Sequence, residues 1–138
     1  MPAQTTSAGT VYYVEFDTAP LLRACLKDGN GDAIDLSGST VTISVAFAMP
    51  RGTYYTSPRR QIITRSPCVI DADQSETGNR GFVSWTPENR PEDILTPPGE
   101  FLYIFEVTYG DGRRQTIPAN TYMTMIIKSP VGGRSLNA

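Results

Sequence analysis

The segment from Phe101 to Tyr109, which ends at the turn residues Asp111 and Gly112, constrains the fold of this chain more than any other feature. Its odd-numbered residues are aromatic or β-branched, and they share one face of an extended chain because side chains alternate along a strand. An Asp-Gly turn that leads to a second apolar run, 122–127, is a strong β-hairpin signal. We therefore predict an all-β protein in which this hairpin contributes core residues: Phe101, Phe105 and Ile126.

Similar β-rich runs recur along the chain and are separated by turn residues such as those of 28–32. The predicted strands cover 11–16, 21–26, 34–47 with an interruption at 37–39, 61–71 and 81–86. Pro67 confines the fourth of these to a sheet edge or splits it, because proline cannot donate to a strand ladder. The pattern predicts an immunoglobulin-like antiparallel β-sandwich of about 7–9 strands.

The chain length predicts one domain. A domain of 138 residues has enough chain for a single hydrophobic core. Residues 10–128 form the predicted sandwich, 1–9 a flexible N-terminal arm and 129–138 a flexible C-terminal tail. The N-terminal residues are neither basic nor strongly apolar, so we expect synthesis and folding in a cytoplasm without a secretory signal.

The charge balance and the lack of histidine exclude several functions. The 12 basic and 14 acidic residues give no nucleic-acid footprint, and no apolar run is long enough for a transmembrane helix. The sequence contains 0 histidines, which removes Ser-His-Asp and Cys-His catalysis. Paired acids remain, at 71 and 73 or 92 and 93, but they resemble ordinary turn residues. We predict no enzyme, no catalytic residue and no cofactor.

Two patterns suggest a metal or a disulfide. Asp28, Asn30 and Asp32 alternate like the first ligands of a calcium loop, but Ala33 stands where such a loop needs glycine, and a tight turn explains the same residues. Cys25 and Cys68 could join two sheets, although their number and the absence of a signal favour two buried thiols. We predict no metal site.

Aromatic residues are the candidates for partner contact. Trp85 could stack on a carbohydrate if it were exposed, but a single tryptophan on a sandwich strand favours the core. Each tyrosine pair, 12–13 and 54–55, is expected to place at least one ring inside. We predict that three tyrosines and the basic pair at the end of the 49–60 loop contact a partner. These residues are Tyr12, Tyr54, Tyr55, Arg59 and Arg60.

The segment 87–100 contains several prolines and is predicted to be a stiff connection. Within it, the apolar residues of 93–95 are expected to pack inward.

Three motifs resemble a module of tailed phages. They are the turn and strand of 26–41, the strand Gly-Phe-Val-Ser-Trp of 81–85, and the strand of 98–107 followed by Asp111, Gly112, Ile117 and Pro118. Together they resemble the N-terminal β-sandwich of siphophage baseplate upper proteins and related tail and neck proteins. The resemblance covers residues 21–128. Those proteins continue into receptor-binding regions, whereas this sequence ends at Ala138, and the segment before Gly99 is longer here.

The resemblance implies a non-enzymatic structural protein of a tailed-phage virion, in the tail, baseplate or neck. Such a protein is made in the host bacterial cytoplasm and then built into the virion. It would assemble as a homo-oligomer and dock onto other phage virion proteins, with no nucleic-acid or membrane partner. The alternatives are a capsid decoration protein and a host-attachment or carbohydrate-binding module.

Overall fold

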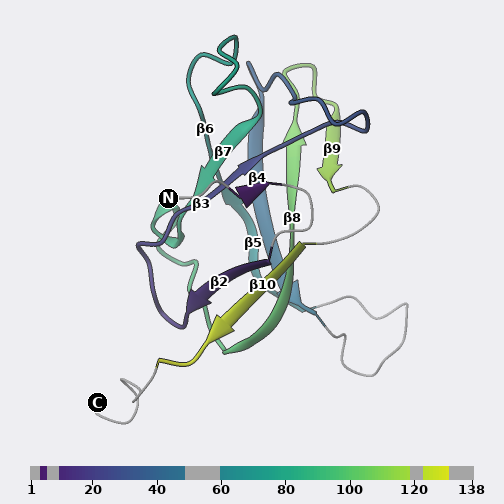
Figure 1. The fold of residues 1–138 in the computed structure, drawn as a ribbon. Coiled ribbons are helices and arrows are strands. Elements are labelled where there is room, and N and C mark those ends of the chain that lie inside the picture. Colours follow the sequence, from purple (N-terminus) through teal and green to yellow (C-terminus); the bar gives the residue numbers. More distant parts are fainter. Residues whose placement is uncertain (1–3, 6–9, 49–59, 119–122, 131–138) are drawn as a thin grey trace.

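The computed structural model describes residues 4–5, 10–48, 60–118 and 123–130, and it forms two sheets packed face to face (Figure 1). The strands are β1 (Gln4–Thr5), β2 (Thr10–Val14), β3 (Leu22–Cys25), β4 (Thr40–Phe47), β5 (Gln61–Pro67), β6 (Val69–Ile70), β7 (Phe82–Trp85), β8 (Gly99–Thr108), β9 (Arg114–Ile117) and β10 (Met123–Lys128). A short 3-10 helix, η1 (Pro87–Asn89), follows β7. None of the described residues belongs to a helix that is long and apolar enough to cross a membrane.

The strand order confirms the predicted immunoglobulin-like sandwich. One sheet has the order β1-β3-β7-β6, and the other has β2-β10-β8-β4-β5, with β9 also paired to β8. Apart from β1, these sheets match the B-E-D and A′-G-F-C-C′ sheets of immunoglobulin-type domains. Segments β9 and β10 pair with successive halves of β8, so they act as one interrupted strand.

The prediction of antiparallel pairing is correct for most of the fold, but it is wrong for the first two strands. The pairs β1–β3 and β2–β10 are parallel. The first strand segments lie beside strands that run in the same direction, which short-range turn signals cannot reveal. Segment β1 also lies within 1–9, where we predicted a flexible arm: Gln4 pairs with Ala24, and Thr5 pairs with Cys25.

The predicted hairpin is present, but its second strand is β9. Tyr109 N donates to Arg113 O at 2.8 Å, and Gly112 takes a φ of +91°, which glycine tolerates. Strand β9 ends before Pro118, which has no N–H for the ladder. The apolar run that we expected to follow the turn is β10, which instead pairs with the first half of β8.

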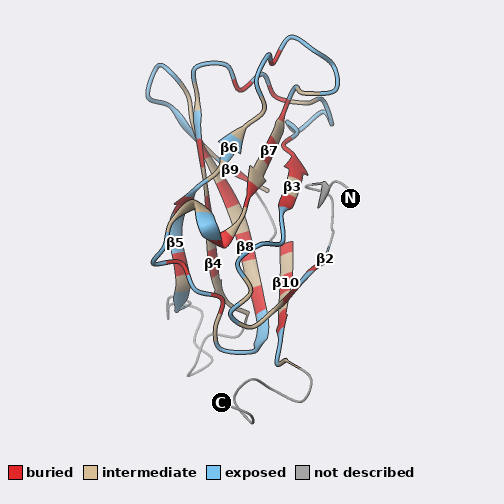
Figure 2. Cartoon of the chain, turned by 90° about the vertical axis from the view of Figure 1, so that its left-hand side faces the viewer, coloured by how far each residue is buried: buried red, intermediate tan, exposed pale blue. Residues whose placement is uncertain are grey.

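The core lies between the two sheets, where alternate residues of each strand are buried (Figure 2). Phe101 and Phe105 are buried as predicted, whereas Ile126 is only partly buried. The alternation along β10 places its odd-numbered residues inside, so Ile126 lies on the opposite face: the inward residues are Met123, Met125 and Ile127.

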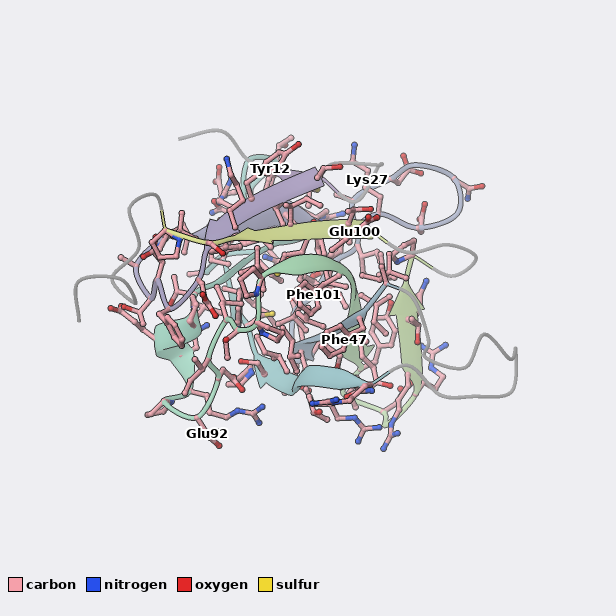
Figure 3. The ribbon with its side chains drawn as sticks, turned by 90° about the horizontal axis from the view of Figure 1, so that it is seen from below. Tyr12, Lys27, Phe47, Glu92, Glu100 and Phe101 are labelled. Carbon is pink, nitrogen blue, oxygen red and sulfur yellow. The ribbon has the colours of Figure 1, made fainter. Side chains whose placement is uncertain are left out.

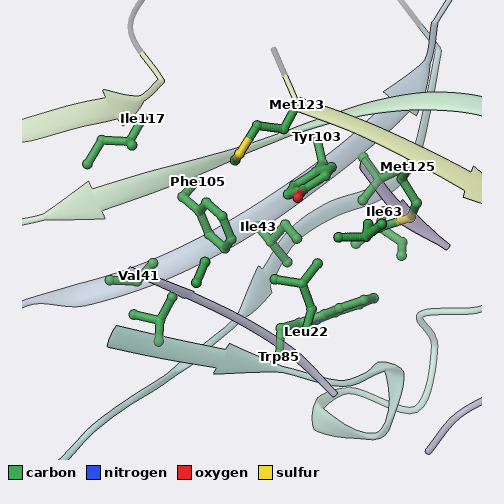
Figure 4. Packing of buried hydrophobic residues seen from close by; sticks show 14 of the residues in the cluster. Leu22, Val41, Ile43, Ile63, Trp85, Tyr103, Phe105, Ile117, Met123 and Met125 are labelled. Atoms are coloured by element: carbon green, nitrogen blue, oxygen red, sulfur yellow. The ribbon is translucent and has the colours of Figure 1, made fainter. Parts of the chain in front are cut away.

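Trp85 joins the two sheets. Its side chain is fully buried on the β7 side of the hydrophobic cluster (Figure 4), which confirms the core interpretation. The indole Nε1 of Trp85, on β7, donates to Ser66 Oγ, on β5, at 2.8 Å, and Ser66 is also fully buried. The bond satisfies two polar groups that would each destabilise the core if left unpaired.

The predicted strand 61–71 is split at Pro67, as expected from its sequence. Strand β5 belongs to one sheet and β6 to the other, and Cys68 N donates to Val41 O at 2.9 Å between them. The chain therefore crosses from sheet to sheet immediately after the residue that binds Trp85.

We expect Ser66→Ala to lower the free energy of unfolding by about 1–3 kcal/mol, because it leaves the indole N–H buried without a partner. Trp85→Phe should lower it by a larger amount through lost packing. In the Trp85→Phe background, Ser66→Ala should have a smaller effect, since the bond is already absent. Urea denaturation of the four proteins checks this. Additive effects of the two substitutions would contradict it.

Candidate interaction surfaces

The Tyr12–Tyr13 pair divides between surface and core. Tyr12 is 66% exposed, whereas Tyr13 is buried and meets Trp85 edge-on, with 6.1 Å between ring centroids. The hydroxyl of Tyr13 donates to Pro20 O at 3.3 Å, and burial raises its pKa well above the ordinary range. Figure 3 shows Tyr12 pointing away from the core. The prediction that at least one ring of this pair lies in the core is therefore confirmed.

Tyr12 lies on the outer face of the larger sheet. Along the register, Tyr12 pairs with Ile126, and Ile126 pairs with Glu100. In the next row outward-facing Thr124 pairs with Leu102, and Leu102 pairs with Ala46. We call this surface the outer sheet face, defined by Tyr12, Ala46, Leu102, Ile104, Thr124 and Ile126. These six residues are uncharged, and those other than Tyr12 are partly buried; the exposed Glu100, which pairs with Ile126, places a negative charge at the edge of the face.

Of the remaining predicted contact residues, Arg60 lies in the part of the chain that the structure describes. Tyr54, Tyr55 and Arg59 lie outside the described residues. Arg60 is exposed, and its guanidinium carbon lies 5.5 Å from the centroid of the Phe47 ring. The structure thus places Arg60 at the edge of the sheet and brings it together with Phe47 rather than with Tyr12.

A second surface, a groove, lies where two loops meet at the end of β2. We call it the Phe16 groove; it has a volume of about 470 Å³ and is lined by Phe16, Asp17, Thr18, Pro87, Glu88, Pro91, Asp93, Ile94 and Leu95. Phe16 and Ile94 remain 49% and 50% exposed. We expected 93–95 to pack inward; Asp93 and Leu95 do so, but Ile94 points outward. Successive side chains of this short segment point to opposite sides, so Ile94 faces outward between two inward residues.

One backbone and one side-chain hydrogen bond hold the two walls of the groove together. Phe16 N donates to Leu95 O at 3.0 Å, and Thr96 Oγ1 donates to Glu15 Oε2 at 2.6 Å. Phe16 has a φ of +70°, a conformation that is unusual for a bulky residue. The groove therefore forms from two segments, 16–18 and 87–95, that are distant in the sequence, and no local sequence pattern predicts it.

Arg90 fixes the far wall of the groove. Its Nε and Nη2 atoms donate to Asp93 Oδ2 and Oδ1 at 3.0 and 2.9 Å, and the carboxylate of Asp93 is buried. The same Nη2 donates to Thr64 O, on β5, at 2.6 Å. The guanidinium thereby neutralises the negative charge of the buried Asp93 carboxylate, and it links the loop to the edge of the larger sheet.

The acidic candidates are engaged in turn and surface contacts. Asp28 Oδ1 accepts hydrogen bonds from the N–H groups of Asn30 and Asp32 at 2.9 and 3.0 Å, which is the geometry of the alternative turn interpretation. Asp71 pairs with Arg23, and Asp73 accepts a hydrogen bond from Ser75. Among the described residues, no group of three Cys, Asp or Glu side chains is arranged to hold a metal ion.

Cys25 and Cys68 are free thiols rather than a disulfide, as the sequence favoured, but only Cys25 is buried as predicted, whereas Cys68 is partly buried. Cys25 is buried in β3, and Cys68 lies in the crossing between β5 and β6. Burial raises the pKa of each thiol; for Cys25 the positive charges of Lys27 and Arg23 oppose this effect. Both thiols are therefore poor nucleophiles near neutral pH.

Comparison with models of protein families finds no match, and no curated protein matches the chain. Among solved structures, the crystal structure of CopC from Methylosinus trichosporium OB3b is similar, with a TM-score of 0.40 and 10% sequence identity. The similarity covers 88% of this chain and 86% of that one. We base no functional argument on so distant a likeness.

Replacing Arg90 with Gln should lower the free energy of unfolding by about 2–3 kcal/mol, because it leaves the Asp93 carboxylate buried without its charged partner. Adding Asp93→Asn should recover part of the loss, since the second substitution removes the uncompensated charge. Urea denaturation of the two variants measures both effects. A double variant that is no more stable than Arg90→Gln would argue against a charge effect.

Alkylation of both cysteines should be slow in the native protein and fast after denaturation, because their raised pKa values reduce the thiolate fraction near pH 7. Mass spectrometry under non-reducing conditions should find two modified cysteines per denatured chain. An unmodified pair in the denatured, unreduced protein would indicate a disulfide instead.

Proposed function

We propose that this protein is a non-enzymatic structural component of a tailed-phage virion, in the tail, baseplate or neck. It assembles symmetrically through the outer sheet face and docks onto other virion proteins. The mechanism is surface complementarity between folded domains rather than chemistry at a catalytic centre.

The observation that carries the proposal is the outer sheet face. Tyr12, on β2, is 66% exposed and shares this face with uncharged residues of β10, β8 and β4, while Glu100 lies at its edge. Tyrosine is enriched at protein interfaces, and charged residues are depleted from interface centres. The resemblance of 26–41, 81–85 and 98–118 to phage tail modules supports a virion as the setting.

Two further observations favour a structural role over its alternatives. The absence of histidine from the sequence removes the usual nucleophile and proton-transfer arrangements. Trp85, the residue that would have served as a carbohydrate-stacking platform, is fully buried. A capsid decoration protein would use the same outer sheet face, so locating the protein in particles separates the two structural roles.

Substituting Leu102 with Arg should convert an oligomer to a monomer, because it places a charge at the centre of the outer sheet face. Val69→Arg is the matched control: Val69 is 59% exposed but lies on β6 of the other sheet. Light scattering coupled to size-exclusion chromatography gives the mass of each protein. A wild-type protein that stays monomeric at high concentration would contradict assembly through this face.

Purified phage particles should contain this protein in a fixed copy number that fits a tail or neck symmetry. Quantitative mass spectrometry of the particles measures the copy number. Imaging with the subunit located in density gives its position and symmetry. Density on the capsid surface would favour the decoration role, and absence from particles would overturn the virion proposal.

A further inference from the structure

The connection between β3 and β4 begins with a turn that carries an exposed Asn-Gly pair. The turn spans 28–32 and is flanked by Lys27 and Ala33, which form an isolated β-bridge. Asn30 and Gly31 are both exposed. The side-chain amide of Asn30 forms no hydrogen bond with any described residue, so it is free to change its orientation.

Gly31 leaves its backbone nitrogen sterically accessible. Its φ is +86°, and a Cβ at this position would meet no atom within 4 Å. Because glycine has no side chain, the nitrogen that follows Asn30 can approach the side-chain carbonyl carbon of that residue. The other two asparagines in the described ranges, Asn79 and Asn89, are each followed by an arginine, whose side chain hinders the same approach.

Asp28 holds the turn closed. Its Oδ1 accepts hydrogen bonds from Asn30 N and Asp32 N at 2.9 and 3.0 Å. Its carbonyl oxygen accepts a hydrogen bond from Gly31 N at 3.0 Å, and its own N donates to Asp32 O at 2.8 Å. The nitrogen of Gly31 is thus engaged in the closed turn, and its attack on the Asn30 side chain requires the turn to open.

The reaction open to this pair is intramolecular, and it makes asparagine a chemically labile residue. Gly31 N loses its proton to solvent base and attacks Cγ of Asn30. A new C–N bond closes a cyclic succinimide, and the side-chain nitrogen leaves as ammonia. Water then opens the ring: cleavage at Cγ gives aspartate, whereas cleavage at the main-chain carbonyl gives isoaspartate. The net reaction consumes water and releases ammonia, and it needs neither a metal nor an enzyme.

We propose that Asn30 is a site of spontaneous deamidation and that Asp28 sets the rate by holding the turn closed. The product adds an acidic side chain between Asp28 and Asp32, where like charges repel. The isoaspartate form also lengthens the backbone within the turn, which disturbs the bridge at its base. The turn is not part of the outer sheet face, so the proposal does not depend on the proposed assembly.

Ageing the purified protein in heavy-oxygen water at mildly alkaline pH tests the site. Trypsin releases the peptide 28–51, in which Asn30 is the only asparagine or glutamine. This peptide should lose ammonia and take up heavy oxygen, with isoaspartate as the main product. Isomerisation of an aspartate also takes up the label but releases no ammonia, so the peptide mass separates the two reactions. The peptide 81–113, which contains Asn89, should keep its amide.

Two variants test the role of Asp28. Asp28→Ala removes the carboxylate that binds Asn30 N, whereas Asp32→Ala removes a carboxylate of the same turn that forms no hydrogen bond with Asn30 or Gly31. Asp28→Ala should speed the loss of the Asn30 amide about fivefold, which corresponds to ~1 kcal/mol of turn stability. Asp32→Ala should leave the rate unchanged. Equal acceleration by both substitutions would indicate a general charge effect and would overturn the role of Asp28.

The denatured wild-type protein supplies the reference rate, because its turn is open. Deamidation of Asn30 should be slower in the native protein than in the denatured one, and Asp28→Ala should bring the native rate closer to that reference. An amide that is lost only after denaturation would overturn the site in the folded protein. Equal rates in the native and denatured wild-type protein would overturn the control by the turn.

Discussion

The packing of Trp85 against Tyr13 and Ser66 fixes the geometry on which both interaction surfaces depend. Trp85 ends β7 and lies directly before the loop that forms one wall of the groove. Tyr13 contacts the Trp85 ring edge-on, so the neighbouring Tyr12 must point to the outer sheet face. The same strand then delivers Phe16 to the groove. One buried aromatic contact thereby positions an exposed ring on each surface.

The sequence predicts the sandwich well because alternation and turn chemistry are local properties. The odd-numbered residues of 101–109, the turn at 111–112 and the split at Pro67 all lead to the observed strands. The outward position of Ile126 follows from the local alternation along Met123–Lys128, which the prediction overlooked, whereas the parallel pairing of β2 with β10 depends on strands that are distant in the sequence. The groove was not predictable for the same reason, since it joins 16–18 to 87–95 and requires a positive φ at a phenylalanine.

The two surfaces suit different kinds of contact. The outer sheet face is broad and is built from rigid paired strands, which fits association with another folded domain. The Phe16 groove is a hollow that combines apolar lining residues with acidic ones. Because the surfaces use different residues, a subunit could occupy both at once.

The hydrogen bonds from Arg90 to β5 also affect how molecules of this protein meet each other. Strand β5 is the last strand of its sheet, and an open strand edge is a template for pairing with another chain. The Arg90 guanidinium donates a hydrogen bond from Nη2 to Thr64 O at 2.6 Å, and its Nη1 lies 3.5 Å from Arg65 O. A bulky cation thus covers acceptors that a foreign strand would need. The side chain that supports the groove therefore also protects the sheet from uncontrolled edge-to-edge aggregation.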